Sequence, residues 1–382
     1  MPLLINGILL LIFWLLAIYS TSVYESFTMT LRSVNFADPT NYYYFYQQLK
    51  AIWYIIIIIL VLWKFPIKSL KSHKFASIIM VITFILQCLV FTKLWESYNW
   101  ARWWLNIPHI PSLQPSEFFK LAYVIFLASW LTRKKEQMNE SGFLLTFIIL
   151  SALLYFVFLL IPDFGTVLII WATALIMVRF AGLNIKKTAT ILVIWLWAWV
   201  FAGLTLWFVS DDFSYLQDRF AYFFTTNEDK IKEERETTWW QPEQALIAIW
   251  WWGFWGNGYW NWLQKYSNLP EAYCDFIFAA FSEEIWFKWN LILILLYVWM
   301  FRYVLRHLQK VTDPQLKLVW VWIISLIIVQ TFVNMWVNVK IIPTTWITLP
   351  FISAGWSALM VNCIELLLLY KILQTENKVL AR

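Results

Sequence analysis

The stretch Ile55-Ile56-Ile57-Ile58-Ile59-Leu60-Val61-Leu62-Trp63 decides the fold class of this chain. It lies within an apolar run, residues 46–65, of the length that a helix needs to cross a bilayer, about 20 residues. Similar runs recur along the sequence: 61% of the 382 residues are hydrophobic and 14% are charged, whereas a soluble domain carries about 25% charged residues. Too few polar side chains remain to cover these runs in water. We therefore predict a single all-α, polytopic integral membrane domain over residues 1–382.

The apolar runs predict about ten transmembrane helices. The first run lacks the basic segment and small-residue cleavage site of a secretory signal, so we expect it to be a retained span. A large external loop, residues 210–274, is expected between helices seven and eight, and loops of this length are commonly functional. The expected spans are residues 3–24, 46–65, 74–94, 115–132, 143–161, 163–182, 186–209, 275–301, 316–339 and 347–371.

Basic residues gather in alternate loops, at 64–74, 133–135, 186–187 and 302–310. Because cytoplasmic loops are enriched in Lys and Arg, this bias predicts a multi-pass membrane protein with both termini in the cytoplasm. The net charge of +6 is explained by this bias, and it favours attraction to anionic membrane lipid. A nucleic-acid partner is not needed to explain it. Three scattered cysteines and three scattered histidines predict neither a disulfide framework nor a metal centre.

The balance of tryptophan and glycine is unusual. The chain has 29 Trp and 9 Gly, where average usage of about 7% predicts roughly 27 Gly. The segment Trp250-Trp251-Trp252-Gly253-Phe254-Trp255-Gly256 resembles a glycine-rich loop with bulky residues inserted. We hypothesise that UGA codons read as glycine in the source cell have been translated as tryptophan. Mass spectrometry that found Trp at positions 346 and 356 of the native protein would contradict this.

Two segments place charges at the start of apolar runs. In Ser112-Leu113-Gln114-Pro115-Ser116-Glu117-Phe118-Phe119-Lys120, the acid and the lysine are three residues apart and share one helix face. Charges within a membrane are costly and indicate function by default, although a structural ion pair explains them equally well. Asp163 follows Pro162 at the start of another span, where it is either an N-cap or part of a polar cavity.

These segments, with three others, resemble the SEDS family of membrane proteins, the group that contains RodA and FtsW. The resemblance covers nearly the whole chain and is strongest over residues 244–284, where Asp275 follows Leu269-Pro270-Glu271-Ala272-Tyr273-Cys274. Tyr273 and Cys274 replace the His and Thr usual in the family. The matching segments are 99–105, 112–120, 162–166, 244–284 and 334–357, and the tryptophans on family glycines are Trp100, Trp250, Trp252, Trp260, Trp286, Trp336, Trp346 and Trp356.

The resemblance implies an inverting peptidoglycan glycosyltransferase that polymerises lipid II at the outer face of the inner membrane. Polymerisation requires an acceptor sugar hydroxyl, a poor nucleophile near neutral pH, to attack an anomeric carbon. A positioned carboxylate can take the proton as the bond forms, and the resemblance assigns this catalytic role to Asp275. From position alone, a cap at the start of the eighth span explains this residue as well.

The remaining expectations concern the substrate and partners. The pyrophosphate leaving group needs cations nearby, and the candidates on or beside external loops are Arg102, Lys120, Arg219 and Lys265. The other expected substrate-binding residues are Glu117, Asp163, Gln244, Glu271 and Ser353. An Mg²⁺ or Mn²⁺ ion at the pyrophosphate fits this chemistry, although the sequence has no dedicated metal motif.

The resemblance also implies a partner, a class B penicillin-binding protein that crosslinks the strands. Residues 264–272 and 348–353 are closer to the division-type branch of the family than to the branch for cell-shape maintenance. A lipid II flippase, which would also need a polar cavity open to lipid, and a scaffold without activity are the alternative functions.

Overall fold

The computed structural model describes residues 2–32, 38–92, 95–98, 101–105, 112–161, 163–209, 241–250, 269, 272–285 and 287–380. Helices dominate these residues, and a two-stranded antiparallel hairpin, β1 (Trp95–Tyr98) and β2 (Ala101–Leu105), precedes the fifth helix. The helices are α1 (Pro2–Thr21), α2 (Val23–Arg32), α3 (Tyr43–Trp63), α4 (His73–Cys88), α5 (Pro115–Arg133), α6 (Ser141–Leu160), α7 (Phe164–Ala181), α8 (Ile185–Val209), α11 (Gln241–Trp250), α12 (Ile277–Ile285), α13 (Phe287–His307), α14 (Pro314–Asn338) and α15 (Trp356–Leu380).

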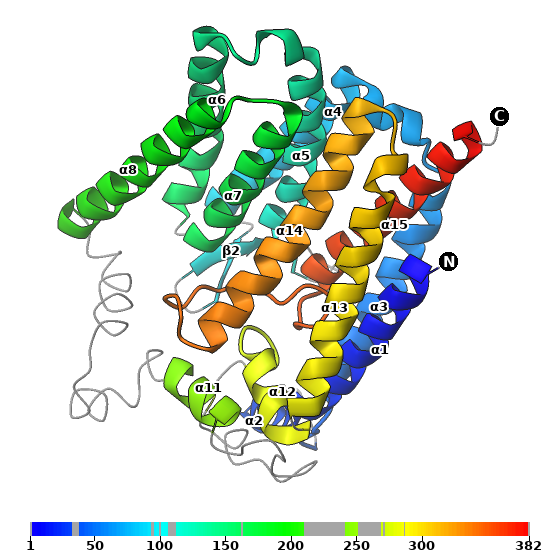
Figure 1. Ribbon diagram of the computed structural model, residues 1–382. Coiled ribbons are helices and arrows are strands. Elements are labelled where there is room, and N and C mark those ends of the chain that lie inside the picture. Colours follow the sequence, from blue (N-terminus) through cyan, green and yellow to red (C-terminus); the bar gives the residue numbers. More distant parts are fainter. Residues whose placement is uncertain are drawn as a thin grey trace.

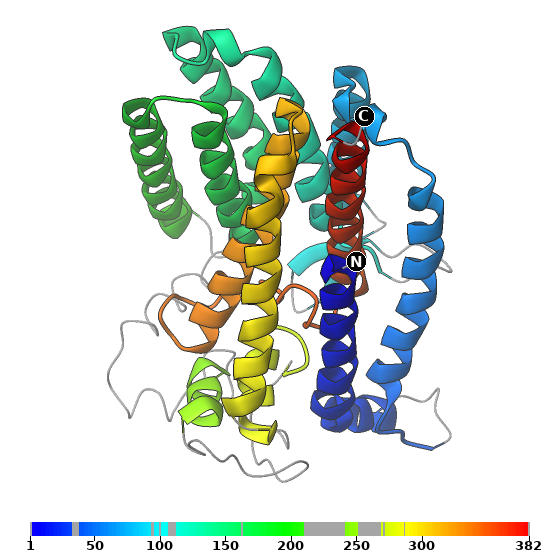
Figure 2. The same ribbon diagram turned by 45° about the vertical axis from the view of Figure 1, so that its right-hand side comes forward.

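The long helices form a bundle with two distinct ends. The short connections at 64–72, 134–140, 182–184 and 308–313 lie at one end, and α2, α11 and α12 lie at the other (Figures 1 and 2). The first end carries the basic loops of the sequence, so the charge asymmetry of the sequence is a spatial asymmetry of the bundle. Helix α14 lies at its centre and contacts α5, α7, α13 and α15.

Eight of the described helices are long and apolar enough to cross a membrane, so the prediction of a polytopic helical membrane protein is confirmed. Two further expected spans, 115–132 and 186–209, coincide with α5 and α8. The expected count of about ten spans is therefore roughly matched. The eight are Pro2–Thr21, Tyr43–Trp63, His73–Phe91, Ser141–Phe158, Phe164–Ala181, Asn290–Lys310, Pro314–Asn338 and Trp356–Lys378.

Three boundaries differ from the expectation. The eighth predicted span, 275–301, contains two helices, α12 and α13, and the tenth begins at Trp356 rather than at 347. Prolines at 343 and 350 disfavour a helix there because proline lacks an N–H donor and restricts the residue before it. Phe351 adopts a left-handed φ of 66°. Helix α2 lies almost entirely between the first two expected spans, 3–24 and 46–65, where no helix was predicted.

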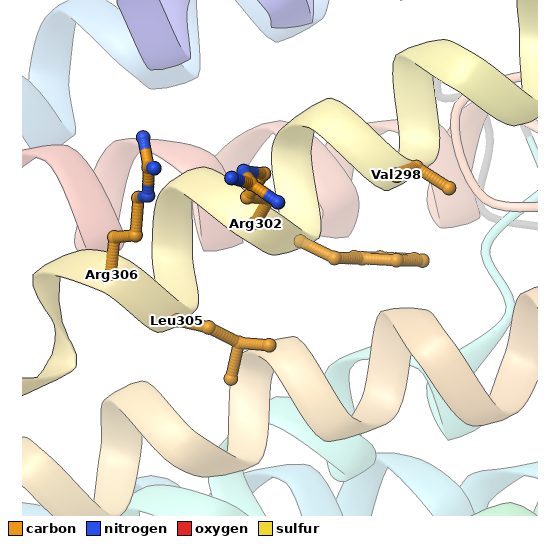
Figure 3. Close-up of a pocket in the computed structure, with 5 residues that line it drawn as sticks. Val298, Arg302, Leu305 and Arg306 are labelled. Atoms are coloured by element: carbon orange, nitrogen blue, oxygen red, sulfur yellow. The ribbon is translucent and has the colours of Figure 1, made fainter.

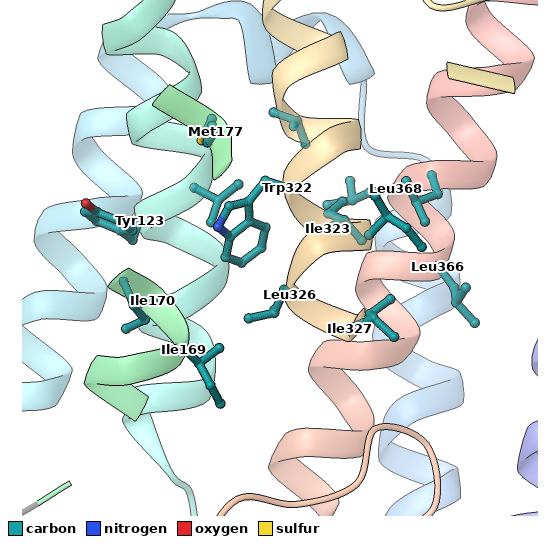
Figure 4. Packing of buried hydrophobic residues seen from close by; sticks show 14 of the residues in the cluster. Tyr123, Ile169, Ile170, Met177, Trp322, Ile323, Leu326, Ile327, Leu366 and Leu368 are labelled. Atoms are coloured by element: carbon teal, nitrogen blue, oxygen red, sulfur yellow. The ribbon is translucent and has the colours of Figure 1, made fainter. Parts of the chain in front are cut away.

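The core lies where α14 meets its neighbours. Figure 4 shows Trp322, Ile323, Leu326 and Ile327 of α14 between side chains of α5 and α7 on one side and α15 on the other. The outer helices differ: α3, α6 and α8 expose many large apolar side chains, with Trp53 70% exposed. An apolar surface of this extent suits a lipid environment, which agrees with the hydropathy of the spans.

Two of the tryptophans that fall on family glycines make contacts that are common for a tryptophan side chain. The indole of Trp346 contacts that of Trp103, with ring centroids 4.5 Å apart, and Trp356 Nε1 donates to the Ser112 carbonyl at 2.6 Å. Among the described residues, only Lys340 and Phe351 combine a side chain with a positive φ. The described backbone therefore does not require glycine at either tryptophan, and the codon hypothesis stays a prediction.

Candidate functional site

The turn that carries Asp275 is fixed by two asparagines of α14. Asp275 lies two residues before α12, and the residue is buried, with 6% of its surface exposed. Its backbone carbonyl accepts hydrogen bonds from Asn334 Nδ2 and Asn338 Nδ2, both at 3.0 Å. The Asn338 side-chain oxygen accepts from the Ala279 amide at 3.1 Å and so satisfies a donor in the first turn of α12. Both side chains thus hold the backbone of Asp275, and Asn338 also holds the helix that follows it.

A second support comes from the irregular segment 343–355, here called the 343–355 loop. The Ser353 hydroxyl donates to the Cys274 carbonyl at 2.7 Å and accepts from the Leu349 amide at 2.7 Å. The Ala354 amide donates to the Tyr273 carbonyl at 3.0 Å. Ser353, one of the predicted site residues, therefore lies beside the Asp275 turn, bonded to its backbone.

The 343–355 loop also connects to a buried ion pair in α5. Lys120 Nζ lies 2.8 Å from Glu117 Oε1, and both residues are buried. The ammonium also donates to Gln330 Oε1 at 3.4 Å, and Gln330 Nε2 donates to the Thr348 carbonyl at 3.0 Å. The predicted pairing of Glu117 with Lys120 is thus present, and Gln330 links the pair to the loop.

Asp163 caps α7 beside the same loop. Its Oδ1 accepts from the Thr166 amide at 3.1 Å, as the N-cap interpretation predicts. Burial raises the pKa of the Asp163 carboxyl, and its hydrogen bonds with Thr166 oppose this shift. A Cβ added at Gly165 would lie 2.9 Å from Ile347 Cγ1, so glycine is needed for α7 to approach the loop this closely.

The other predicted site residues divide into two groups. Gln244 is buried on α11, where Ala245 and Ala248 belong to one apolar cluster with Ala272 and Phe276, close to the Asp275 turn. The backbone of Arg102 lies in β2. The side chain of Arg102 and the whole of Arg219, Lys265 and Glu271 lie outside the described residues.

Sequence reasoning missed part of this site. Gln330, Asn334 and Asn338 were not predicted as site residues, yet they join α14 to the Asp275 turn and to the loop. Their spacing of four residues places them on one face of a helix. Polar residues repeated at that interval within an apolar span were the signal that could have found them.

Neither a metal cluster nor the shallow pocket on α13 adds to this site. Within the described ranges, no group of three or more His, Cys, Asp or Glu side chains could hold a metal ion. The pocket has a volume of about 600 Å³ and is lined by Val298, Phe301, Arg302, Leu305 and Arg306 of α13. Figure 3 shows it from close by. It lies toward the end of α13 that carries the basic loops, away from Asp275.

Fold and site together define a class: a multi-pass helical membrane protein with a buried acid held by hydrogen bonds at one end of its bundle. The chain matches the family of cell cycle proteins represented by FtsW, RodA and SpoVE over residues 3–378. It therefore belongs to the FtsW/RodA/SpoVE family.

Relatives and solved structures agree with this assignment. The chain is 29% identical to the "Probable peptidoglycan glycosyltransferase FtsW" of Burkholderia thailandensis, over 96% of this chain and 78% of that protein. It is 31% identical to the stage V sporulation protein E of Bacillus subtilis, over 75% of each chain. It resembles the rod shape determining protein RodA of Thermus thermophilus with a TM-score of 0.67 at 18% identity, over 98% and 96% of the two chains.

A further similar structure comes from work on polymerization and crosslinking by a peptidoglycan synthase complex, with a TM-score of 0.69 at 19% identity over 96% and 97% of the two chains. At these identities the two structures support the fold alone.

Proposed function

We propose that this protein is a peptidoglycan glycosyltransferase that polymerises lipid II into glycan strands at the outer face of the inner membrane, in cell division. The observation that carries the proposal is Asp275, a buried acid whose backbone carbonyl accepts from Asn334 and Asn338. It lies two residues before α12, and α12 is at the end of the bundle opposite the basic loops (Figure 1). If those loops are cytoplasmic, this acid faces the outer side and both termini lie in the cytoplasm.

In the proposed reaction, the acceptor sugar hydroxyl attacks the anomeric carbon of the donor and forms the new glycosidic C–O bond. The Asp275 carboxylate takes the hydroxyl proton, and the bond to the lipid pyrophosphate breaks, with its electron pair leaving on the pyrophosphate. Attack opposite the leaving group inverts the anomeric centre. Proton transfer by a positioned group contributes typically about 10²–10⁴-fold.

Binding of the pyrophosphate is proposed for Arg102, Arg219 and Lys265, since cations stabilise the charge that develops on it. Lys120 is engaged with Glu117 and Gln330, so we assign it to the buried ion pair beneath the loop. Any Mg²⁺ or Mn²⁺ would neutralise the same pyrophosphate, and the proposed steps use only side chains of this chain. A class B penicillin-binding protein that crosslinks the strands is the proposed partner.

Purified protein given lipid II tests the proposal against a flippase. Glycan chains resolved by gel electrophoresis are expected from the wild type, and none from Asp275→Asn. Transfer of lipid II across vesicle membranes without glycan chains would favour the flippase. Neither activity, in a folded protein with and without its partner, would contradict both functions.

A further inference from the structure

Helix α15 carries an acid in the most buried part of the bundle. Glu365 is 0% exposed, as are Val361 and Leu369, four residues before and after it, so it occupies the inward stripe of the helix. Within the part of the chain that the structure describes, neither carboxylate oxygen has a hydrogen-bond partner. The proposed reaction does not use this residue.

The charged groups that act on Glu365 come from α5. Helices α5 and α15 pack together and are joined near their first turns, where the Ser357 hydroxyl accepts from the Gln114 amide at 3.2 Å. Ser357 lies on the same stripe, about two turns before Glu365. The electrostatic influences on Glu365 are those of Lys120 and Glu117.

The cations of the other neighbours lie elsewhere: Lys317 is near the start of α14, and further lysines are in the connections 64–72 and 308–313, at the end of the bundle with the basic loops. Helix α1 has no acidic or basic residue, and α14 presents the neutral Gln330. In α3 the one charged residue is Lys50, in its second turn. On α15 itself, Cys363 is the titratable neighbour, and Lys371 donates to the carbonyls of Leu62 and Trp63 at 3.0 and 2.8 Å.

One ammonium therefore faces two carboxyl groups, and it is already bonded to Glu117. If both acids were ionised, the apolar interior would hold an uncompensated negative charge. An isolated carboxylate is so costly to bury that the group takes up a proton instead.

We propose that Glu365 is a proton-binding site in the membrane interior: it is a neutral carboxylic acid while Lys120 pairs with Glu117, and release of its proton to water creates a second carboxylate that competes for Lys120. Hydrogen bonds connect Lys120 through Gln330 to Thr348 of the 343–355 loop. In that loop Ser353 holds the Cys274 carbonyl next to Asp275. Glu365 is thus a positioning residue, which acts on the site through Lys120.

Thermal unfolding of the full-length protein between pH 5 and pH 9 tests the protonation. A neutral buried acid binds its proton more tightly when folded than when unfolded, so its stabilising contribution is present at low pH and is lost as pH rises. Glu365→Gln keeps the shape and cannot titrate. We expect its Tm to equal that of the wild type at pH 5 and to exceed it by several degrees at pH 9.

The matched control is Glu376→Gln on the same helix, because the Glu376 carboxylate accepts hydrogen bonds from the Thr312 amide and hydroxyl at 2.9 and 2.5 Å. We expect it to lower Tm at pH 9. A Glu365→Gln protein that is less stable than the wild type at pH 9, or that fails to fold while Glu376→Gln folds, would mean that Glu365 is ionised and paired, and would overturn the proposal.

Infrared difference spectroscopy gives a direct readout. The wild type minus Glu365→Gln spectrum at pH 7 should contain the carbonyl band of a protonated carboxylic acid, and only a carboxylate band there would contradict the proposal. The effect on polymerisation rests on the proposed function: the activity ratio of Glu365→Gln to wild type should rise with pH. If neither protein polymerises, the proposed function fails, while the unfolding and infrared results still decide the protonation of Glu365.

Discussion

The two halves of α14 stabilise different parts of the molecule: one half packs against the helices of the bundle, and the other binds the Asp275 turn. In the half nearer the basic loops, Trp320, Trp322 and Leu326 are buried among apolar side chains of the bundle. In the other half, the side chains of Asn334 and Asn338 are just as buried, but both donate to the backbone carbonyl of Asp275. One helix therefore supports both the bundle and the site.

The difference separates stability from geometry. Apolar burial is non-directional, so side chains such as Trp322 and Leu326 fix which helices are neighbours without fixing any atom closely. The defined bonds of this half, from Trp320 to the Val304 carbonyl at 3.0 Å and from Gln315 to the Leu70 carbonyl at 2.7 Å, lie away from the Asp275 turn. Hydrogen bonds require defined distances and angles, so the second half fixes the position of the acid. Substitutions in the first half should therefore mainly lower stability, and substitutions in the second half should mainly lower activity.

The largest loss of stability is expected from the ion pair beside the polar half. Lys120→Met leaves the Glu117 carboxylate buried and unpaired, which should cost about 3–5 kcal/mol. Chemical denaturation in detergent measures this. The double variant Lys120→Met/Glu117→Leu removes both charges and should recover most of the loss. No recovery would mean that the pair matters for more than its charge balance.

A cavity in the apolar half should cost nearly as much. Leu326→Ala removes a side chain packed between α14 and its neighbours and should lower stability by about 3 kcal/mol. Polymerisation per folded molecule should stay within about twofold of the wild type, because the hydrogen bonds to the Asp275 turn remain. A large loss of turnover in folded protein would contradict the division of α14 into two roles.

Removing the hydrogen bonds of Asn338 should have the opposite effect, a smaller loss of stability and a larger loss of turnover. Asn338→Leu leaves the Ala279 amide without its side-chain partner and should cost about 2 kcal/mol, since an unsatisfied buried donor costs about 1–3 kcal/mol. Turnover should fall at least tenfold, because the carbonyl of Asp275 also loses a donor. Stability and turnover should be measured on the same preparation, with Leu326→Ala as the control.

The smallest effect is expected at the cap of α7. Asp163→Ala removes the bond to the Thr166 amide and should cost about 1 kcal/mol, whereas Asp163→Asn keeps a capping oxygen and should cost little. Since burial raises the pKa of Asp163, its contribution to stability is lost as pH rises. Asp163→Asn should therefore weaken the pH dependence of Tm, and an unchanged pH profile would count against that shift.

The sequence predicted the helices and the Glu117–Lys120 pair because both depend on local spacing, in apolar runs and in two charges three residues apart. The break between α12 and α13 was missed, although Glu283, Glu284 and Lys288 flank it within an otherwise apolar run. The bonds of Ser353 and Ala354 to residues 273 and 274 join segments about 80 residues apart, and no local pattern encodes such contacts. The spacing of Asn334 and Asn338 indicated that both lie on one helix face, but their hydrogen bonds to the Asp275 turn were not predicted.

The central claim is that Asp275 takes the proton of the acceptor hydroxyl. The most direct test is the rate of lipid II polymerisation by Asp275→Asn, measured beside the wild type with unfolding of both proteins as a check. We predict a loss of at least about 10²-fold with the fold retained, because the backbone carbonyl that Asn334 and Asn338 hold is unchanged. Turnover equal to that of the wild type would contradict the account.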